Sequence, residues 1–315
     1  MAAFKIPKTP SLFASTYELA DYLELLCFAY DGEYSINDAK KQICYPSDEN
    51  VEDGIIDDDD KIYDCLQLAL GEIDRRRTAC GIGYPFSTDY DVIKLTSTDT
   101  VSILSYKYLL FATRLNMKTC KIIDGVDGTL LFEELSAIAV KDYLGLHSES
   151  MVFGTSTEGG FRGKILDLIS RIKEGKDYKT SYKSTNDEKD GGLDVVVWKS
   201  FADGEKGKFI GFGQCKTGTE WRNQVGALDP SDFCNTYFVD SPFCRPIKLF
   251  FVAESFRDNW EKICRRSGIL FDRCRIMEHL GSLKNRDHID LRSRMSTWVD
   301  GNMKYIIQSY RPDYQ

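Results

Sequence analysis

Three polar side chains in the stretch 190–221 have the types and the spacing that phosphodiester chemistry needs. Asp194 precedes a run of β-branched residues, and Gln214 and Lys216 stand at the end of a second apolar run. Alternate residues of a strand point to the same face, so Gln214 and Lys216 share one face while Cys215 points to the other. A hairpin between the two runs would place the Asp194 carboxylate beside Gln214.

A carboxylate, an amide oxygen and a lysine ammonium can together support phosphodiester cleavage. Hard oxygen donors hold Mg²⁺, the metal polarises the phosphate and lowers the pKa of bound water, and the lysine steadies the hydroxide or the developing charge. The Cys215 sulfur is too soft for this ion, so we expect the backbone carbonyl of Cys215 to contribute instead. The predicted cofactor is therefore Mg²⁺, with Mn²⁺ as a substitute.

The same residues resemble the PD-(D/E)XK restriction-endonuclease superfamily. The string DGGLD, a strand and then GQCK is similar to the GGxD and QxK signature of its Mrr-type branch. The resemblance implies that Asp194 binds the metal, that Gln214 stands at the acidic position of the wider superfamily, and that Lys216 is the catalytic lysine. Because glutamine carries no charge, the metal would depend on Asp194, backbone carbonyls and another acid.

Two glutamates are candidates for that further acid. Glu133 lies in the segment LFEELSAIAVKDYLG, which resembles the opening helix of Mrr-type nucleases, where an FE pair often supplies an acid near the metal. Glu158 comes just before a second expected helix, from Phe161 to Ile172, and we rank it slightly behind Glu133. The alternative for Glu133 is a solvated glutamate near a helix start, where the helix dipole favours a negative charge.

The pattern around the hairpin also has a plain structural explanation. DGG is a common turn, and a strand with Gln and Lys on its outer face is an ordinary solvated edge. The nuclease interpretation is favoured because three features occur together: GGxD, an intervening strand and QCK.

The elements around these residues predict an α/β fold for a domain of residues 123–315. The resemblance, which covers roughly residues 129–280, implies a restriction-endonuclease-like mixed β-sheet core with flanking helices. Apolar and β-branched runs predict strands, and apolar residues at helical spacing predict helices. The expected elements after the opening helix are a hairpin of Leu193 to Trp198 and Lys208 to Cys215, a strand at 246–253, a helix at 259–266, a strand at 269–276 and a last helix at 289–307.

Residues 1–122 predict a mainly helical module before the nuclease domain. Ser15 and Glu18 form a capping-box pattern before a first helix, and an apolar stripe from Ile62 predicts another that ends at three arginines, 75–77. These arginines complement the helix dipole or contact phosphate or a partner. The preceding stretch 47–61, with four consecutive aspartates, predicts a solvated linker. A strand at 92–95 and a helix at 101–117 follow.

The composition indicates a globular protein of a reducing compartment. The chain has 315 residues, of which 42% are hydrophobic and 29% charged. No run approaches the apolar length of a membrane helix and the first residues lack the apolar core of a secretory signal, so we expect a cytoplasmic protein. Ten cysteines without a CxxC motif favour buried thiols over disulfides or structural zinc.

Charge is unevenly distributed along the chain. The net charge is −8, and residues 1–120 account for all of it with 12 Lys+Arg against 20 Asp+Glu. The nuclease-like part is balanced and therefore repels DNA less. Within it, the lysine-rich stretch 173–190 carries Tyr178 and Tyr182, which could stack on the bases of a single strand.

We therefore expect a metal-dependent DNA endonuclease that hydrolyses phosphodiester bonds. The resemblance implies a role in defence against foreign DNA from phages or plasmids, and the acidic N-terminal module is an expected docking point for a protein partner. A homo-oligomer is a further expectation. The alternatives are a catalytically silent protein of nuclease fold that binds nucleic acid or a partner, and a nuclease that acts on RNA.

Overall fold

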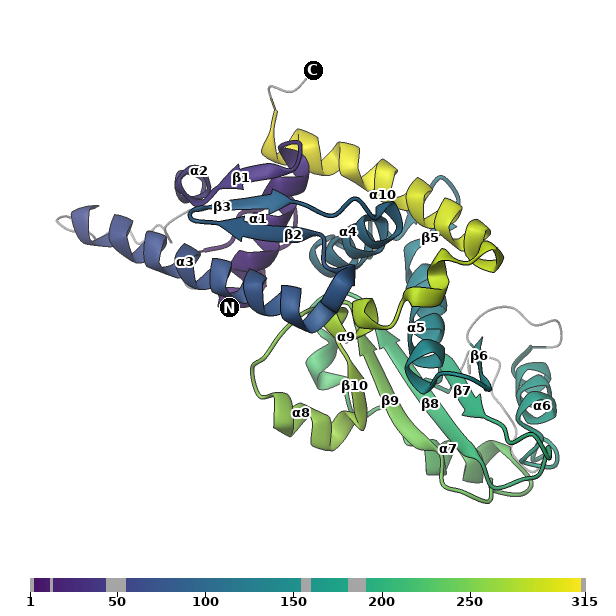
Figure 1. Cartoon of the computed structure of the whole chain (residues 1–315). Helices are drawn as coiled ribbons and strands as arrows, with labels where there is room; N and C mark the ends of the chain where they lie inside the picture. Colours follow the sequence, from purple (N-terminus) through teal and green to yellow (C-terminus); the bar gives the residue numbers. More distant parts are fainter. Residues whose placement is uncertain (1–2, 12–13, 44–54, 154–159, 181–190, 313–315) are drawn as a thin grey trace.

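The structure is a computed structural model that describes residues 3–11, 14–43, 55–153, 160–180 and 191–312; side chains are not described for residues 55–59. Figure 1 shows a five-stranded sheet in the lower half of the view, with helices on both faces and a largely helical N-terminal region above it. The predicted class, mixed α/β with a mainly helical N-terminal part, is confirmed.

The central sheet has the strand order β10-β9-β8-β7-β6. Strands β6, β7 and β8 are antiparallel neighbours, whereas β8, β9 and β10 are parallel. Parallel neighbours need crossover connections, and helices α7 and α8 provide them. The strand bounds are Ser148–Val152 (β6), Val195–Lys199 (β7), Phe209–Lys216 (β8), Ile247–Val252 (β9) and Ile269–Phe271 (β10).

Strands β7 and β8 form the hairpin that the sequence predicts. Val195 pairs with Gly213 and Lys199 with Phe209, which fixes the register at both ends. Glycine at 213 permits close packing against β9, because a Cβ built there would lie 2.6 Å from a ring carbon of Phe251. The register of the hairpin therefore brings residue 194 opposite residue 214.

Each face of the sheet is covered by a different set of helices. Val195 and Val197 point into the large cluster that contains α5 and α9, whereas Val196 and Trp198 point into a second cluster with α6 and α7. On β9, Phe250 packs in a third cluster under α8. The helix bounds are Gly128–Leu144 (α5), Gly160–Ile172 (α6), Pro230–Tyr237 (α7), Trp260–Ser267 (α8) and Arg273–Glu278 (α9).

The N-terminal region packs three long helices around a small antiparallel sheet of order β1-β3-β2. Its first helix begins with the predicted capping box, in which the Ser15 N–H donates to Glu18 Oε2 at 3.2 Å. The bounds are Thr16–Ala29 (α1), Glu33–Ser35 (β1), Ile36–Lys40 (α2), Ile55–Cys80 (α3), Phe86–Asp89 (β2), Val92–Leu95 (β3) and Thr100–Arg114 (α4).

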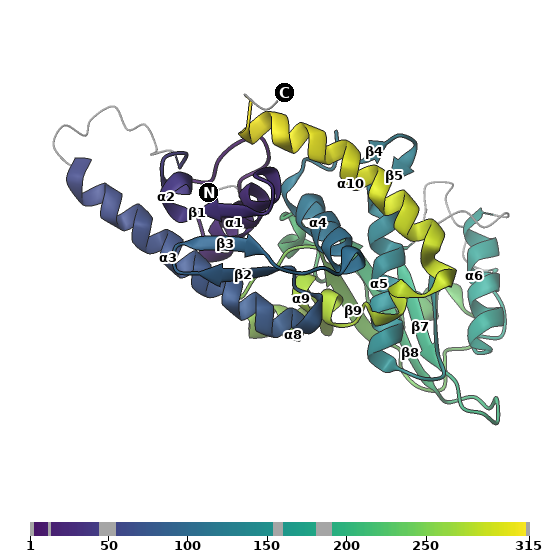
Figure 2. The ribbon, with the colours of Figure 1, turned by 45° about the horizontal axis from the view of Figure 1, so that its top comes forward.

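Helix α10 (Ile289–Tyr310) joins the two parts of the chain. Figures 1 and 2 show it running from the sheet region back along the N-terminal helices, and it contacts α1, α4 and α5. The boundary expected at residue 122 coincides with a short hairpin of β4 (Ile122–Ile123) and β5 (Val126–Asp127). One hydrophobic cluster nevertheless extends from Phe4 to Tyr310 through both parts.

Several local predictions need correction. Asp57 to Asp60 lie within the first turns of α3 and not in a linker. The strand predicted at 269–276 ends at Phe271, and Asp272 then caps α9 by accepting the Arg275 N–H at 3.0 Å. Strand β6 and helix α7 were not predicted; Asp229 and Pro230 are the cap signals of α7.

A buried ionic network ties the N-terminal region to the sheet. Arg76, Arg114 and Arg273 are fully buried, and each of them donates to Asp21, at 2.7, 2.7 and 2.8 Å. Burial by itself raises the pKa of Asp21, but the three guanidiniums more than offset this and hold that pKa well below its usual range. Arg273 also donates to the Ala253 carbonyl just beyond β9 at 3.0 Å.

The arginines at 75–77 do not form the phosphate-binding group considered from the sequence. Arg76 is buried in the ionic network, and Arg75 is held by Glu72 at 2.6 Å. Of the three, Arg77 alone is exposed, beside Asp74. The first two arginines therefore serve packing between helices.

Candidate functional site

Asp194 is held at the start of β7 by backbone and side-chain bonds to β8. Gly191 and Gly192 precede it with positive φ values of 60° and 78°, a conformation that glycine adopts without strain. The Asp194 N–H donates to the Gly213 carbonyl at 2.9 Å, and its Oδ2 accepts the Cys215 N–H at 2.7 Å. The carboxylate is thus fixed beside the last residues of β8, as the hairpin prediction requires.

Gln214 is a buried amide with an unsatisfied acceptor. Its side chain is only 4% exposed, and Oε1 is a buried atom without a hydrogen-bond partner among the residues that the structure describes. A Cβ built on Gly192 would lie 3.6 Å from Nε2, so the glycine turn borders the amide. Buried acceptors are normally paired, and an unpaired oxygen here is consistent with a ligand site.

Lys216 shares the face of Gln214 at the end of β8. In the parallel register, Gln214 pairs with Phe250 of β9 and Lys216 pairs with Val252. Phe250 and Val252 both belong to the cluster under α8. The preceding residue on this face, Phe212, belongs instead to the cluster under α6 and α7. The two polar side chains therefore stand where the helical cover of the sheet changes from one cluster to the other.

Cys215 contributes a backbone carbonyl to the same edge. Its N–H points to Asp194, and the N–H and C=O of one residue in a strand point to the same side, so its carbonyl also points there. Its thiol lies on the opposite face against the large core. Burial raises the pKa of the Cys215 thiol well above its usual value, and the negative charges of Asp194 and Glu133 add to this.

Glu133 belongs to the helix that packs on the opposite face of the sheet from Gln214 and Lys216. It lies in α5, whose first residues are capped by Asp127, which accepts the Thr129 N–H at 2.8 Å. Its charge acts on Cys215 and also contributes to the raised pKa of Tyr108, in which burial is the main cause. The structure thus places Glu133 behind Cys215, across the sheet from Gln214 and Lys216.

The remaining predicted site residues are less informative. Glu158 and Tyr182 lie outside the described residues. Tyr178 is buried and bridges to Phe238, so the prediction that it stacks on nucleic acid bases is wrong. Among the described residues, no group of three or more His, Cys, Asp or Glu side chains is arranged to hold a metal ion. A metal at this edge would rely on Asp194 together with neutral oxygens.

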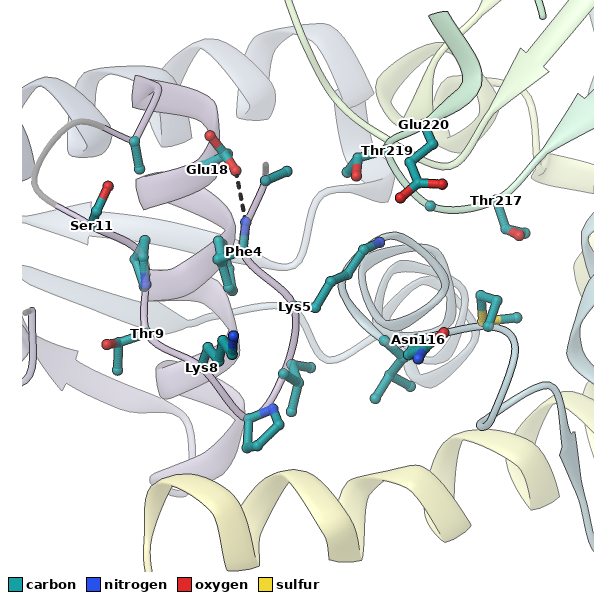
Figure 3. A pocket seen from close by; sticks show the side chains of 18 of the residues that line it. Phe4, Lys5, Lys8, Thr9, Ser11, Glu18, Asn116, Thr217, Thr219 and Glu220 are labelled. Atoms are coloured by element: carbon teal, nitrogen blue, oxygen red, sulfur yellow. Dashed lines mark hydrogen bonds between the residues drawn. The ribbon is translucent and has the colours of Figure 1, made fainter. Parts of the chain in front are cut away.

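A pocket of about 960 Å³ lies next to the end of β8, and no pattern in the sequence pointed to it. It is lined by the N-terminal segment 3–11, the end of α4 and the loop 217–220 that directly follows Lys216. Figure 3 shows Lys5 extending toward Thr219 and Glu220. Burial lowers the pKa of Lys5 to about 8, and Arg114 adds to this effect while Glu254 and Glu220 oppose it.

Comparisons with known proteins give no relative for this chain. No family model, no curated protein and no solved structure matches it. No helix in the described part of the chain is both long enough and apolar enough to cross a membrane.

Proposed function

We propose that this protein is a metal-dependent endonuclease that hydrolyses phosphodiester bonds in DNA. The observation that carries the proposal is the end of the β7–β8 hairpin, where Asp194 accepts the Cys215 N–H and Gln214 Oε1 is buried with no partner among the described residues, two positions before Lys216. The three candidate ligands, the Asp194 carboxylate, Gln214 Oε1 and the Cys215 carbonyl, are all oxygens, the donors that Mg²⁺ prefers. The mixed sheet and the GGxD and QxK pattern support the same assignment, and the resemblance makes foreign DNA the proposed substrate.

The residues have separate roles in this proposal. Asp194 supplies the negative charge of the site, and Gln214 and the Cys215 carbonyl complete the oxygen set that would hold Mg²⁺ or Mn²⁺. The bound ion would supply polarisation of the scissile phosphate and a more acidic water. Lys216 orients that water or stabilises the charge that develops on the phosphate oxygens. Glu133, whose charge acts on Cys215, is the proposed further acid of the site.

Plasmid cleavage tests the proposal directly. Supercoiled plasmid is incubated with wild type, Asp194→Asn and Lys216→Ala, in the presence of Mg²⁺, Mn²⁺ or EDTA. We expect cleavage with either ion and none with EDTA, and a reduction of at least about 100-fold in both variants. Arg171→Ala, a change on the exposed outer surface of α6, is the matched control and should cut like wild type.

The second candidate is a catalytically silent protein of the same fold. It is favoured by one observation, the neutral Gln214 at a position where the wider superfamily has an acid. Absence of cleavage with every ion, together with metal-independent DNA binding by all three proteins, would support it and reject the endonuclease. Preferential cleavage of RNA in a parallel digestion would change the substrate class instead.

A further inference from the structure

The exposed side of α8 carries a concentration of positive charge. Lys262, Arg265 and Arg266 follow i, i+3, i+4 spacing, which places them on one side of the helix, whereas Ile263 and Ser267 face the protein. All three basic residues are exposed. Figure 1 shows α8 beside β10, at the opposite end of the sheet from β6. The helix thus presents its basic side to solvent.

These cations differ in their pairing from surface arginines such as Arg171 and Arg311. Within the described part of the chain, none of the three forms an ion pair. By contrast, Arg171 pairs with Asp167 at 2.9 Å and Arg311 with Asp31 at 2.7 Å. The one acid on α8, Glu261, lies one turn before Arg265 on the same side of the helix but forms no ion pair with it in the structure. A group of unneutralised cations on a chain with net charge −8 indicates an anionic partner.

The basic side is continuous with further positive charge on the sheet. Lys248 projects from β9 on the same face as Gln214, because it pairs with Phe212 two residues earlier on β8. Burial lowers the pKa of Lys248; the negative charge of Asp229 opposes this effect and the positive charge of Arg266 adds to it. At the other end of α8, the guanidinium carbons of Arg257 and Arg275 lie 5.9 and 4.7 Å from the centre of the Trp260 ring.

The position of α8 connects this surface to the candidate active site. The helix packs through Ile263 against Phe250 and Val252, the β9 residues that are level with Gln214 and Lys216. Cations at the side of a nuclease site fit the phosphates of a DNA backbone that passes through it, because phosphate contacts fix the position of the duplex without reading its sequence.

We infer that the basic side of α8, formed by Lys262, Arg265 and Arg266, binds the phosphate backbone of the DNA that lies across the Asp194, Gln214 and Lys216 site. The inference rests on the proposed endonuclease function and adds the surface that holds the substrate. The charge on this surface explains how a protein of negative net charge binds a polyanion.

DNA binding measured against salt concentration tests this inference. A fluorescein-labelled duplex is titrated with full-length protein carrying Lys216→Ala, so that the duplex stays intact, and anisotropy is followed over a range of KCl concentrations. The test variant adds Lys262→Gln, Arg265→Gln and Arg266→Gln. The control adds Arg77→Gln, Arg171→Gln and Arg311→Gln, which changes the net charge equally at paired surface arginines.

We expect the test variant to bind at least about tenfold more weakly and to lose about 2 to 3 from the slope of log K against log salt, while the control changes little. Thermal unfolding of the test variant should match that of its parent, because the α8 cations form no ion pair with any described residue. An unchanged slope in the test variant, together with normal plasmid cleavage by wild type, would overturn the inference and leave the endonuclease proposal intact. Failure of every variant to bind DNA, with no cleavage by wild type, would overturn both.

Discussion

The ionic network and the candidate active site both bury polar groups, but they satisfy them differently. In the network, Asp21 is shared by three guanidiniums, and Glu24 accepts from Tyr106 at 2.9 Å. At the site, Gln214 Oε1 has no partner among the described residues. One network atom, Arg114 Nη2, is also unpaired within the described part of the chain, although the same guanidinium is held by Asp21 and Glu18.

Under the proposed function, this difference separates the buried polar groups that serve the fold from the one that would serve a ligand. A buried charge that is paired on all sides stabilises one arrangement of helices, and removing either partner leaves the other uncompensated. A buried acceptor without a partner destabilises the empty protein and is compensated when a donor or cation binds. Stability measurements on the network and metal titrations at the site can therefore separate the two roles.

The largest expected effect is a loss of folding stability when the charge of Asp21 is removed from the ionic network. Asp21→Asn leaves three buried guanidiniums without their shared charge, and we expect it to lower the free energy of unfolding at pH 7 by about 3–5 kcal/mol in urea denaturation. Asp38→Asn breaks an exposed ion pair with Lys41 and should cost less than about 1 kcal/mol. An Asp21 variant as stable as the Asp38 variant would show that the network is not structural.

The same variant has a defined pH dependence. Because the folded-state pKa of Asp21 is lowered, its stabilisation is present above the unfolded carboxyl pKa of about 4 and is lost as the pH falls below it. The stability difference between wild type and Asp21→Asn should therefore narrow below about pH 4. A difference that stays constant on acidification would contradict the charge-based explanation.

A second, smaller effect on stability concerns Lys5, a half-buried cation that donates to the Thr113 carbonyl. Its pKa is about 8 in the folded protein, whereas the ordinary lysine value is 10.5, so the unfolded chain binds more protons between these values. Stability of wild type relative to Lys5→Met should rise by up to about 3 kcal/mol from pH 8 to pH 10.5. The exposed Lys8→Met variant is the control; parallel profiles for all three proteins would exclude this burial effect.

The smallest expected effect tests the unpaired oxygen of Gln214. Gln214→Glu adds a negative charge at the proposed Mg²⁺ site. We expect calorimetry to show Mg²⁺ binding that is about tenfold tighter, equivalent to about 1.4 kcal/mol of binding free energy. Without metal the variant should be less stable than wild type, since the new carboxylate is buried beside Asp194 without a compensating cation. Gln224→Glu places the same charge at an exposed position. Equal Mg²⁺ affinity in both variants would place the metal elsewhere.

Much of the secondary structure could be predicted because it depends on local pattern. The β-branched run in residues 193–198 and the apolar run in residues 208–215 predicted the hairpin, and the register then placed Asp194 opposite Gln214. Strand β6 was missed because its sequence, SESMV, is polar at an edge position and shows no clear alternation. Glu133 was identified through the family resemblance, but its position behind Cys215 follows from the packing of α5.

The sequence by itself determined the local elements and the short-range geometry of the candidate site, because strand alternation and hairpin pairing act between near neighbours. Tertiary structure alone decided which charges are buried together: Asp21 and Arg273 meet across 252 positions of chain, and no local pattern encodes that distance. It also decided that Gln214 Oε1 is buried away from every described donor and that the basic side of α8 stays exposed, because burial depends on every element that packs nearby.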